Sequence, residues 1–151
     1  MGSKIINHHS AINNQKFTHA HRLHGRRAFS AVFDAKVRKN AGPLLLFTKP
    51  NDLPHWRLGL SVSRRVGNAV TRSRHKRMLR EAFRLTQGTW PKRAGADSEQ
   101  PGLGYDLVVV VRPHELMSLE DYQRQLFSGV AAAHRTWEKR LRNADDTQRP
   151  D

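Results

Sequence analysis

The sequence has no cysteine, few aromatic residues and few acids, and each shortage narrows the class of protein. Without cysteine the chain forms neither a disulfide framework nor a thiolate metal site. No window approaches the roughly 18 uncharged apolar residues of a membrane span, and the first residues lack the apolar stretch of a secretory signal. With 151 residues, of which 37% are hydrophobic, the chain suits one small domain with a modest core. These features predict a cytoplasmic protein with no membrane partner.

Positively charged residues, by contrast, are abundant. Lysine and arginine total 27 against 13 acidic residues, which gives a formal net charge of +14. A positive excess of this size attracts polyanions, and nucleic acid is the commonest polyanion of a cytoplasm. A solvated basic surface without function is the plainer interpretation, but it rarely leaves so large an imbalance. The composition therefore favours a nucleic-acid-binding protein.

Hydrophobic periodicity predicts an alternation of helices and strands. The predicted elements are a short helix over 26–36, strands over 44–47 and 57–65, a helix over 70–85, a buried strand over 105–111 and a last helix that begins near Ser118. This order predicts an α/β fold, a single-domain two-layer sandwich in which helices cover one face of a small mixed sheet.

Three segments lack such periodicity. Residues 1–22 are polar and are predicted to be a mobile arm, whose histidines match no metal-ligand spacing. Residues 88–104 are dense in glycine and proline and are predicted to be a flexible surface loop. Residues 141–151 are expected to be a polar tail. The remaining stretch, 23–140, is the predicted nucleic-acid-binding domain.

The strand over 57–65 has two different faces. Leu58, Leu60 and Val62 alternate on a predicted core face. The other face carries Gly59, Ser61, Ser63 and Arg65, which are small or polar and leave room for a ligand. This pattern predicts a groove, although an ordinary solvated face remains the alternative.

Aromatic residues of the first helix could border that groove. Phe29 and Phe33 lie one turn apart, and aromatic rings beside a polar floor offer stacking surfaces for unpaired bases. Arg65 and Arg112 could then neutralise the nucleic-acid backbone. A place in the hydrophobic core is an equally good interpretation of both rings.

The helix over 70–85 carries a ladder of like charges. Arg72, Lys76 and Arg80 are neighbours at helical spacing, and such pairs each cost a few tenths of a kcal/mol. A bound polyanion relieves that repulsion, and the planar guanidinium of arginine reaches two phosphate oxygens at once. Glu81, the one acid from Arg64 to Arg84, is expected to form an intramolecular ion pair rather than to act as a catalytic acid or base.

Residues 57–81 closely resemble, without a gap, the signature of the bacterial ribonuclease P protein. The signature reads approximately R-x-G-x-x-V-S-[KR]-[KR]-x-x-x-A-V-x-R-N-R-x-K-R-x-x-R-E, and this chain reads RLGLSVSRRVGNAVTRSRHKRMLRE. The likeness extends over about residues 22–140. Two positions depart from the family pattern. Ser73 stands where the family usually has asparagine, and His75 stands where an aliphatic residue is expected.

The resemblance implies a function and a set of partners. It implies a protein subunit of ribonuclease P in the endonucleolytic 5′ maturation of tRNA, with hydrolysis performed by the RNA subunit and its bound Mg²⁺. The protein would bind the ribonuclease P RNA and the 5′ leader of precursor tRNA, be monomeric when free, and have no catalytic residue or metal site of its own. The implied fold has the order α-β-β-β-α-β-α with a left-handed βαβ crossover.

The resemblance also implies two groups of contact residues. Those expected to face the catalytic RNA are Arg72, Ser73, Arg74, Lys76, Arg77 and Arg80. Those expected to form the leader cleft are Phe29, Phe33, Phe47, Ser61, Ser63, Arg64, Arg65 and Arg112.

Three other functions remain as alternatives at this point. A ribosomal or ribosome-assembly protein has a similar size and charge. A protein-only nuclease requires clustered Asp, Glu or His to hold metal, whereas the acids here are scattered. The third alternative is a DNA-binding protein, because a basic helix of this kind can also bind DNA.

Overall fold

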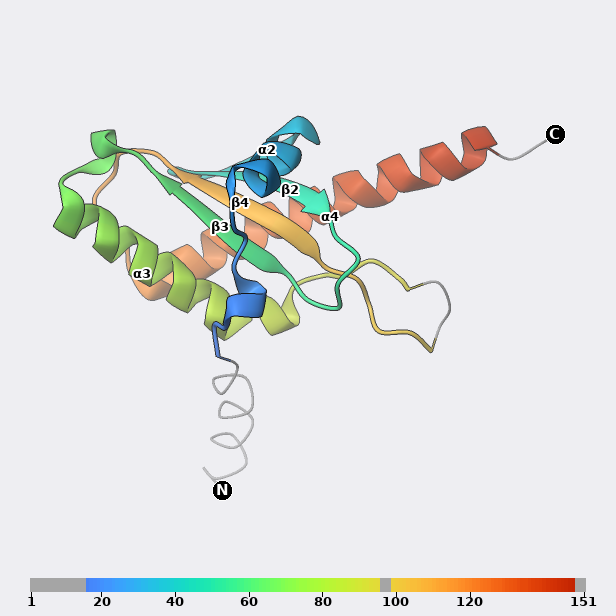
Figure 1. Ribbon diagram of the computed structural model, residues 1–151, viewed down its shortest axis with the longest axis horizontal. Coiled ribbons are helices and arrows are strands. Elements are labelled where there is room, and N and C mark those ends of the chain that lie inside the picture. The colour runs from blue at the N-terminus through green and yellow to red at the C-terminus, as the bar shows by residue number, and fades with distance from the viewer. Residues whose placement is uncertain (1–15, 96–98, 149–151) are drawn as a thin grey trace, which may run out of the picture.

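The computed structural model describes residues 16–95 and 99–148, which form a mixed α/β unit (Figure 1). Short 3-10 turns lie at His19–His21, Arg64–Val66 and Gln87–Thr89. The longer elements are α2 (Arg26–Asp34), β1 (Val37–Ala41), β2 (Leu44–Pro50), β3 (Arg57–Val62), α3 (Ala69–Thr86), β4 (Tyr105–Val111) and α4 (Leu119–Gln148). They follow the expected order of one helix, three strands, a helix, a strand and a last helix.

The four strands form one mixed sheet in the order β1-β2-β4-β3. β1 and β2 make an antiparallel hairpin through Gly42, whose φ of 57° lies in the left-handed region. β2 runs antiparallel to β4, and β3 runs parallel to β4. Because parallel neighbours cannot be joined by a tight turn, the chain crosses over through α3. The mixed sheet is thereby confirmed, and the hand of the crossover stays a prediction.

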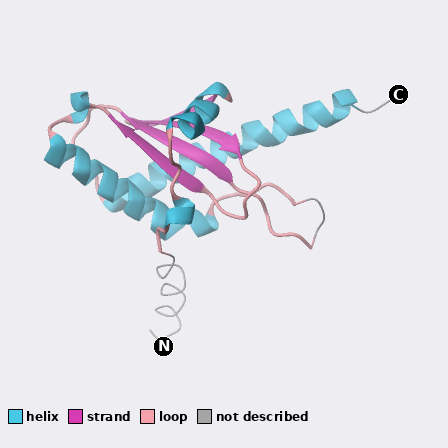
Figure 2. Ribbon diagram, in the orientation of Figure 1, coloured by secondary structure: helices cyan, strands magenta, loops and turns pink. Residues whose placement is uncertain are grey.

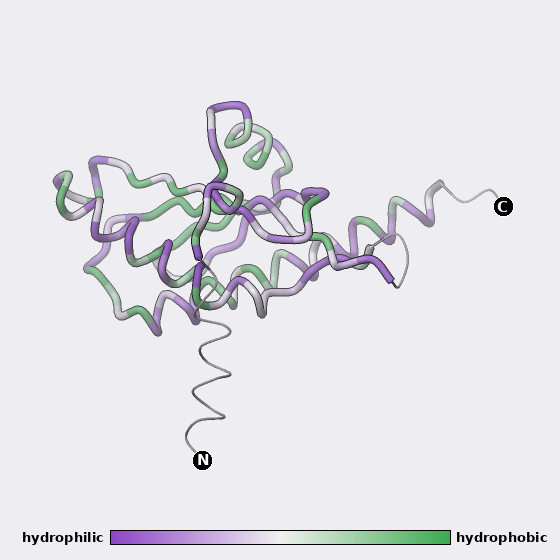
Figure 3. Tube along the Cα trace, turned by 60° about the horizontal axis from the view of Figure 1, so that its bottom comes forward, coloured by the Kyte–Doolittle hydropathy of each residue, from purple (hydrophilic) through white to green (hydrophobic). Residues whose placement is uncertain are grey.

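α3 and α4 cover one face of the sheet (Figure 2). Alternate strand residues meet the apolar stripes of both helices, and in Figure 3 green and purple segments follow one another along the tube. The main buried residues of this layer are Leu44, Leu46, Leu58, Leu107 and Val109 from the strands, Leu79, Ala82 and Phe83 from α3, and Tyr122, Leu126 and Val130 from α4. The α/β sandwich predicted from periodicity is confirmed.

α2 lies on the opposite face, the one that Phe29 and Phe33 of the first helix were expected to border. A second cluster forms there, in which Val32 of α2 packs with Val108 of β4 and with Leu23. Val108 points away from the α3–α4 layer because its neighbours Leu107 and Val109 point toward it. α2 is short, so it adds only a partial layer on this second face.

The N-terminal segment is ordered farther toward the start of the chain than predicted. Arg22 bridges to Leu58 in parallel, and the Leu23 N–H donates to the Leu58 carbonyl at 3.0 Å. Phe17 packs edge-on against Phe83, with ring centroids 5.5 Å apart. Residues 16–22 of the predicted mobile arm thus contact the folded domain, with Arg22 paired beside β3 and Phe17 packed on α3. Residues 1–15 of the predicted arm lie outside the described residues.

The loop and the tail also differ from expectation. Trp90 is only 3% exposed, and Arg93 pairs with Leu103 in an antiparallel bridge, so the ends of the 88–104 loop are packed. Residues 96–98 lie outside the description. The predicted tail is polar, but α4 continues through it to Gln148 and extends beyond the sheet (Figure 1). Neither glycine nor proline lies between Gly129 and Pro150 to end the helix earlier.

Candidate RNA interface

α3 presents its basic side chains on the side away from the core. The side chain of Asn68 caps the helix, accepting from the Thr71 N–H at 2.9 Å. Four buried residues, including His75 and Leu79, anchor the inner side of the helix. The predicted contacts with catalytic RNA are exposed at Ser73, Arg74 and Arg77 and half-buried at Arg72, Lys76 and Arg80.

Two hollows run along this outer side. One, of about 330 Å³, is lined by Ser73, Arg74 and Arg77 with the first residues of α3. The other, of about 480 Å³, is lined by Ser73, Arg77, Lys76, Arg80 and the acidic Glu81, together with Arg22 and Phe17 of the N-terminal segment. Arg72 lines neither hollow, and its buried Nε has no hydrogen-bond partner among the described residues. The structure thus brings five of the six predicted residues together around shared concave surface.

The charge of this surface is not neutralised within the protein. In the described part of the chain, no carboxylate lies within 4 Å of the side-chain nitrogens of Arg74, Lys76, Arg77 or Arg80. Partial burial and the positive charge of Arg22 lower the pKa of Arg80. Both effects disfavour the cation, and a bound anion would offset them.

Glu81, the acid within this segment, pairs with Arg84. The Arg84 Nε donates to the Glu81 carboxylate at 2.9 Å, and the resulting hydrogen bonds lower the pKa of Glu81. The intramolecular ion pair expected for Glu81 is confirmed. Glu81 also lines the larger hollow, but its ion pair is with Arg84 and not with Lys76 or Arg80.

Arg22 is a site residue that the sequence reasoning missed. It lines the hollow with Lys76 and Arg80 because the bridge to Leu58 holds the N-terminal segment beside β3. Its guanidinium also lies 5.3 Å from the centre of the Phe17 ring. No local signal in the sequence indicated this position, since the placement depends on pairing with a strand far along the chain.

The aromatic residues predicted for the leader cleft lie together at α2. The rings of Phe33 and Phe47 meet edge-on, with centroids 4.7 Å apart. Phe29 packs over Gly59, and all three rings are half-buried in the second cluster. Phe29 and Phe33 each pack on the sheet and keep part of their surface exposed, so packing in the core is observed and a contact with unpaired bases stays a prediction.

Phe29 also borders a third hollow, of about 180 Å³, at the edge of β3. Its lining includes Gly59, Arg22, Lys76 and Arg80. Phe29 of α2 and two basic residues of α3, Lys76 and Arg80, therefore share one concave surface. The sequence had assigned these residues to separate contacts, and residues of the N-terminal segment, Arg22 among them, line the same hollow.

The polar residues predicted for the cleft lie at the other end of the same sheet face. Ser61 pairs with Val110 and is half-buried, and Ser63, Arg64 and Arg65 follow at the exposed end of β3. Arg112 is exposed just beyond β4, where its guanidinium donates to Asn40 at 3.0 Å. The eight predicted cleft residues thus form an aromatic group at α2 and a polar group at the ends of β3 and β4.

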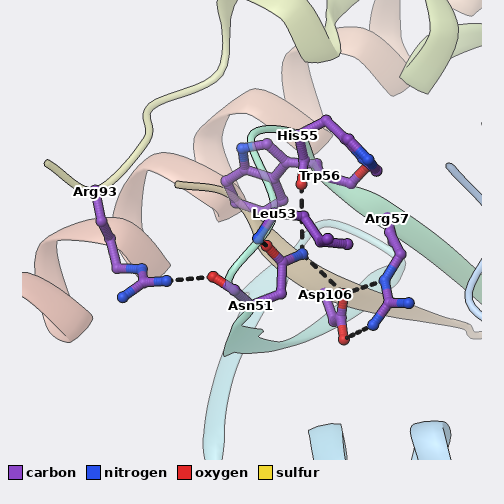
Figure 4. Close-up of polar contacts among 7 residues, drawn as sticks. All are labelled: Asn51, Leu53, His55, Trp56, Arg57, Arg93 and Asp106. Atoms are coloured by element: carbon purple, nitrogen blue, oxygen red, sulfur yellow. Dashed lines mark hydrogen bonds and ion pairs between the residues drawn. The ribbon is translucent and has the colours of Figure 1, made fainter. Parts of the chain in front are cut away.

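Arg57, the first residue of the signature, has a structural role (Figure 4). Its Nε and Nη2 donate to the two carboxylate oxygens of Asp106, both at 2.7 Å. Asn51 donates to the same carboxylate at 2.9 Å and receives a hydrogen bond from Arg93 at its own carbonyl. Asp106 is 7% exposed, so this network fixes the start of β3 against β4.

The described residues contain no group of three or more histidine, aspartate or glutamate side chains that could hold a metal ion. Within the same residues, no helix is both long and apolar enough to cross a bilayer. The fold and the exposed basic helix define a small α/β protein that is suited to binding polyanions.

The chain belongs to the ribonuclease P protein family, whose profile, described as Ribonuclease P, matches residues 17–134. It is 37% identical over 131 residues to the ribonuclease P protein component of Pseudomonas aeruginosa (strain LESB58), covering 85% of this chain and 84% of that protein. It is 36% identical over 111 residues to that of Thermotoga maritima, covering 73% and 82% of the two chains.

Solved structures agree with this assignment. The RNase P protein of Staphylococcus aureus matches with a TM-score of 0.59 at 26% identity, covering 75% of this chain and 94% of that one. The Thermotoga maritima protein in complex with 1-(4-fluorophenyl)-2-thiourea matches with a TM-score of 0.60 at 27% identity, covering 72% and 96%. Membership of this family sets aside the ribosomal, protein-only nuclease and DNA-binding alternatives.

Proposed function

We propose that this subunit of ribonuclease P holds two RNA segments at once, the catalytic RNA on α3 and the 5′ leader of precursor tRNA on the α2 face of the sheet. The family is that of the protein component of ribonuclease P, which acts in 5′ maturation of tRNA with the ribonuclease P RNA as partner. The main support for the proposal is the basic side of α3, where Arg74, Lys76, Arg77 and Arg80 have no carboxylate within 4 Å among the described residues.

The contact with the catalytic RNA is proposed to be electrostatic. Arginine side chains reach two phosphate oxygens at once, and the hollows beside Ser73 and Arg77 offer concave surface for a folded RNA backbone. The proposed contact residues are Arg72, Ser73, Arg74, Lys76, Arg77 and Arg80, with Arg22 added from the N-terminal segment.

The contact with the leader is proposed to combine stacking and charge. The half-buried rings at α2 offer surfaces for unpaired bases, and the guanidinium groups at the ends of β3 and β4 suit the sugar–phosphate backbone. The proposed residues are Phe29, Phe33, Phe47, Ser61, Ser63, Arg64, Arg65 and Arg112.

The chemistry itself is assigned to the RNA. Hydrolysis is proposed to use Mg²⁺ held by the RNA subunit, while the protein supplies positive charge and holds the substrate. The free protein is proposed to be a cytoplasmic monomer.

The test is a cleavage assay at low Mg²⁺ with a bacterial ribonuclease P RNA and a precursor tRNA that carries a 5′ leader. Addition of the protein should restore cleavage at the mature 5′ end, and the double variant Arg74→Ala, Arg77→Ala should weaken this rescue. The matched control, Arg135→Ala with Lys139→Ala, removes the same charge from exposed positions of α4 and should retain the rescue. Equal loss in both variants would mean that net charge alone matters, and absence of rescue by the unaltered protein would contradict the proposal.

A further inference from the structure

A chain of hydrogen bonds beneath α3 ends at the backbone of Arg112. His75, 1% exposed on the inner side of α3, places its Nδ1 3.3 Å from the hydroxyl of Tyr122 on α4. The same hydroxyl lies 2.7 Å from Nε2 of His114, which follows β4. Nδ1 of His114 lies 2.7 Å from the carbonyl oxygen of Arg112. Side chains from α3, α4 and the segment after β4 thus meet at one hydroxyl.

The chemistry of the partners determines which group donates and which accepts in each of these hydrogen bonds. The Arg112 carbonyl can only accept, so in the neutral imidazole His114 carries its proton on Nδ1 and accepts from Tyr122 at Nε2. The Tyr122 oxygen then accepts from His75 and, at 3.4 Å, from the Met117 N–H. Burial and the nearby His114 lower the pKa of His75, which favours its neutral form at pH 7. Tyr122 therefore uses its donor and both of its acceptor sites.

Arg112 itself is held at three points. Its N–H donates to the carbonyl of Pro43 at 3.0 Å, its carbonyl accepts from His114, and its guanidinium donates to Asn40 at 3.0 Å. The side chain nevertheless remains exposed. A cation on a backbone fixed in this way loses little conformational freedom when it binds a phosphate.

We propose that Tyr122 and His114 are positioning residues, which hold Arg112 in place for the phosphate backbone of the leader. His75 ties the same hydroxyl to α3, so that the arginine keeps one position relative to the helix proposed to bind catalytic RNA. The inference rests on the proposed function, because it takes Arg112 as a leader contact. It assigns a role to the buried Tyr122 and the half-buried His114, neither of which is among the proposed RNA contacts.

The experiment is a double-mutant cycle on the holoenzyme reconstituted with a bacterial ribonuclease P RNA. The affinity for precursor tRNA with a long leader is divided by the affinity for one with a minimal leader, so that effects on the tRNA body cancel. Tyr122→Phe keeps the ring in the core but removes the hydroxyl, and should reduce this ratio by about fivefold. Arg112→Gln should reduce the ratio at least as much, and Tyr122→Phe should add nothing in that background.

The chain offers a matched control at the other end of β4. The Tyr105 hydroxyl lies 2.7 Å from Nδ1 of His134, so Tyr105→Phe removes a similar tyrosine–histidine hydrogen bond away from Arg112. This variant should leave the leader ratio unchanged. Additive losses in the double variant, or an equal loss in Tyr105→Phe, would indicate general destabilisation and overturn the inference. A ratio of one for the unaltered holoenzyme would instead remove the proposed leader contact, and the inference with it.

Discussion

Gly59 of β3 lies directly against the ring of Phe29 of α2. A Cβ atom added to Gly59 would stand 2.5 Å from Cζ of the ring and 2.9 Å from Cε1, far inside normal contact distance. The absence of a side chain at this position therefore lets α2 approach the sheet. The glycine of the signature thus acts by leaving room for an aromatic ring, and α2 carries two of the rings proposed for the leader cleft.

Gly59→Ala should displace Phe29 and weaken both packing and leader binding. Overpacking of this kind typically costs about 1–3 kcal/mol, and we expect the lower end because the half-buried ring can move outward. Urea denaturation measures the stability, and the leader ratio defined above measures the binding. Adding Phe29→Leu should relieve the clash. If Gly59→Ala cost the same stability with leucine at position 29, the ring would not be the cause.

Asp106→Ala should destabilise the fold without affecting the RNA contacts. The change leaves Arg57 without its carboxylate and Asn51 without its buried acceptor. We expect a loss of about 2 kcal/mol, less than for a fully buried ion pair, because the Arg57 side chain is 32% exposed and stays partly solvated. Urea denaturation followed through the tryptophan fluorescence measures this loss. Affinity for ribonuclease P RNA at low temperature should stay within about twofold, and a larger fall would place Arg57 or Asp106 in the RNA interface.

The sequence was sufficient to predict the basic side of α3 because both signals there are local. Helical spacing separates Leu79 and Phe83 from Arg74 and Arg77, and the gapless signature covers the whole segment. The strand pattern likewise placed Leu58 on the core face and Gly59 on the opposite face. These features depend on neighbours in the chain, which a single sequence displays.

The features that the sequence did not reveal depend on contacts between segments that are distant in the chain. In some of them these contacts also outweigh the local conformational preference of the residues. Arg22 reaches the site only through its bridge to Leu58, and no periodicity records such pairing. β1 was not located from the residue pattern because Arg38, Lys39 and Asn40 form its middle, and its strand conformation comes from pairing with β2. The link from His75 to Arg112 likewise joins three segments that are separate in the sequence.

Stability should fall as the pH drops below the ordinary histidine range. Burial and His114 lower the pKa of His75 from 6.5, so the unfolded chain takes up this proton at a higher pH than the folded chain does. Acidification therefore favours unfolding from about pH 6.5 down to the lower pKa of the folded state. His21, whose pKa is lowered by burial and by His55, adds to the same slope.

His75→Leu isolates the contribution of His75 to this pH dependence. Urea denaturation between pH 7.5 and about pH 5 should give a shallower slope for the variant, with up to about one proton fewer taken up on unfolding. Leucine keeps an apolar side chain beneath α3, so packing above pH 7 should be largely retained. Identical slopes for the two proteins would show that His75 is protonated equally in the folded and unfolded states.

Truncation after Arg142 should leave both stability and function almost unchanged. The helix extends beyond the sheet there (Figure 1), residues 143–147 are exposed, and even Leu141 is 39% exposed. We expect the midpoint of thermal unfolding to fall by no more than about 2 °C, because little apolar surface is lost. Truncation after Thr136 is the contrasting case, since it removes Trp137, whose indole N–H donates to the buried hydroxyl of Thr48 at 3.0 Å. If truncation after Arg142 instead abolished rescue of cleavage at low Mg²⁺ while the protein stayed folded, the end of α4 would contribute an RNA contact of its own.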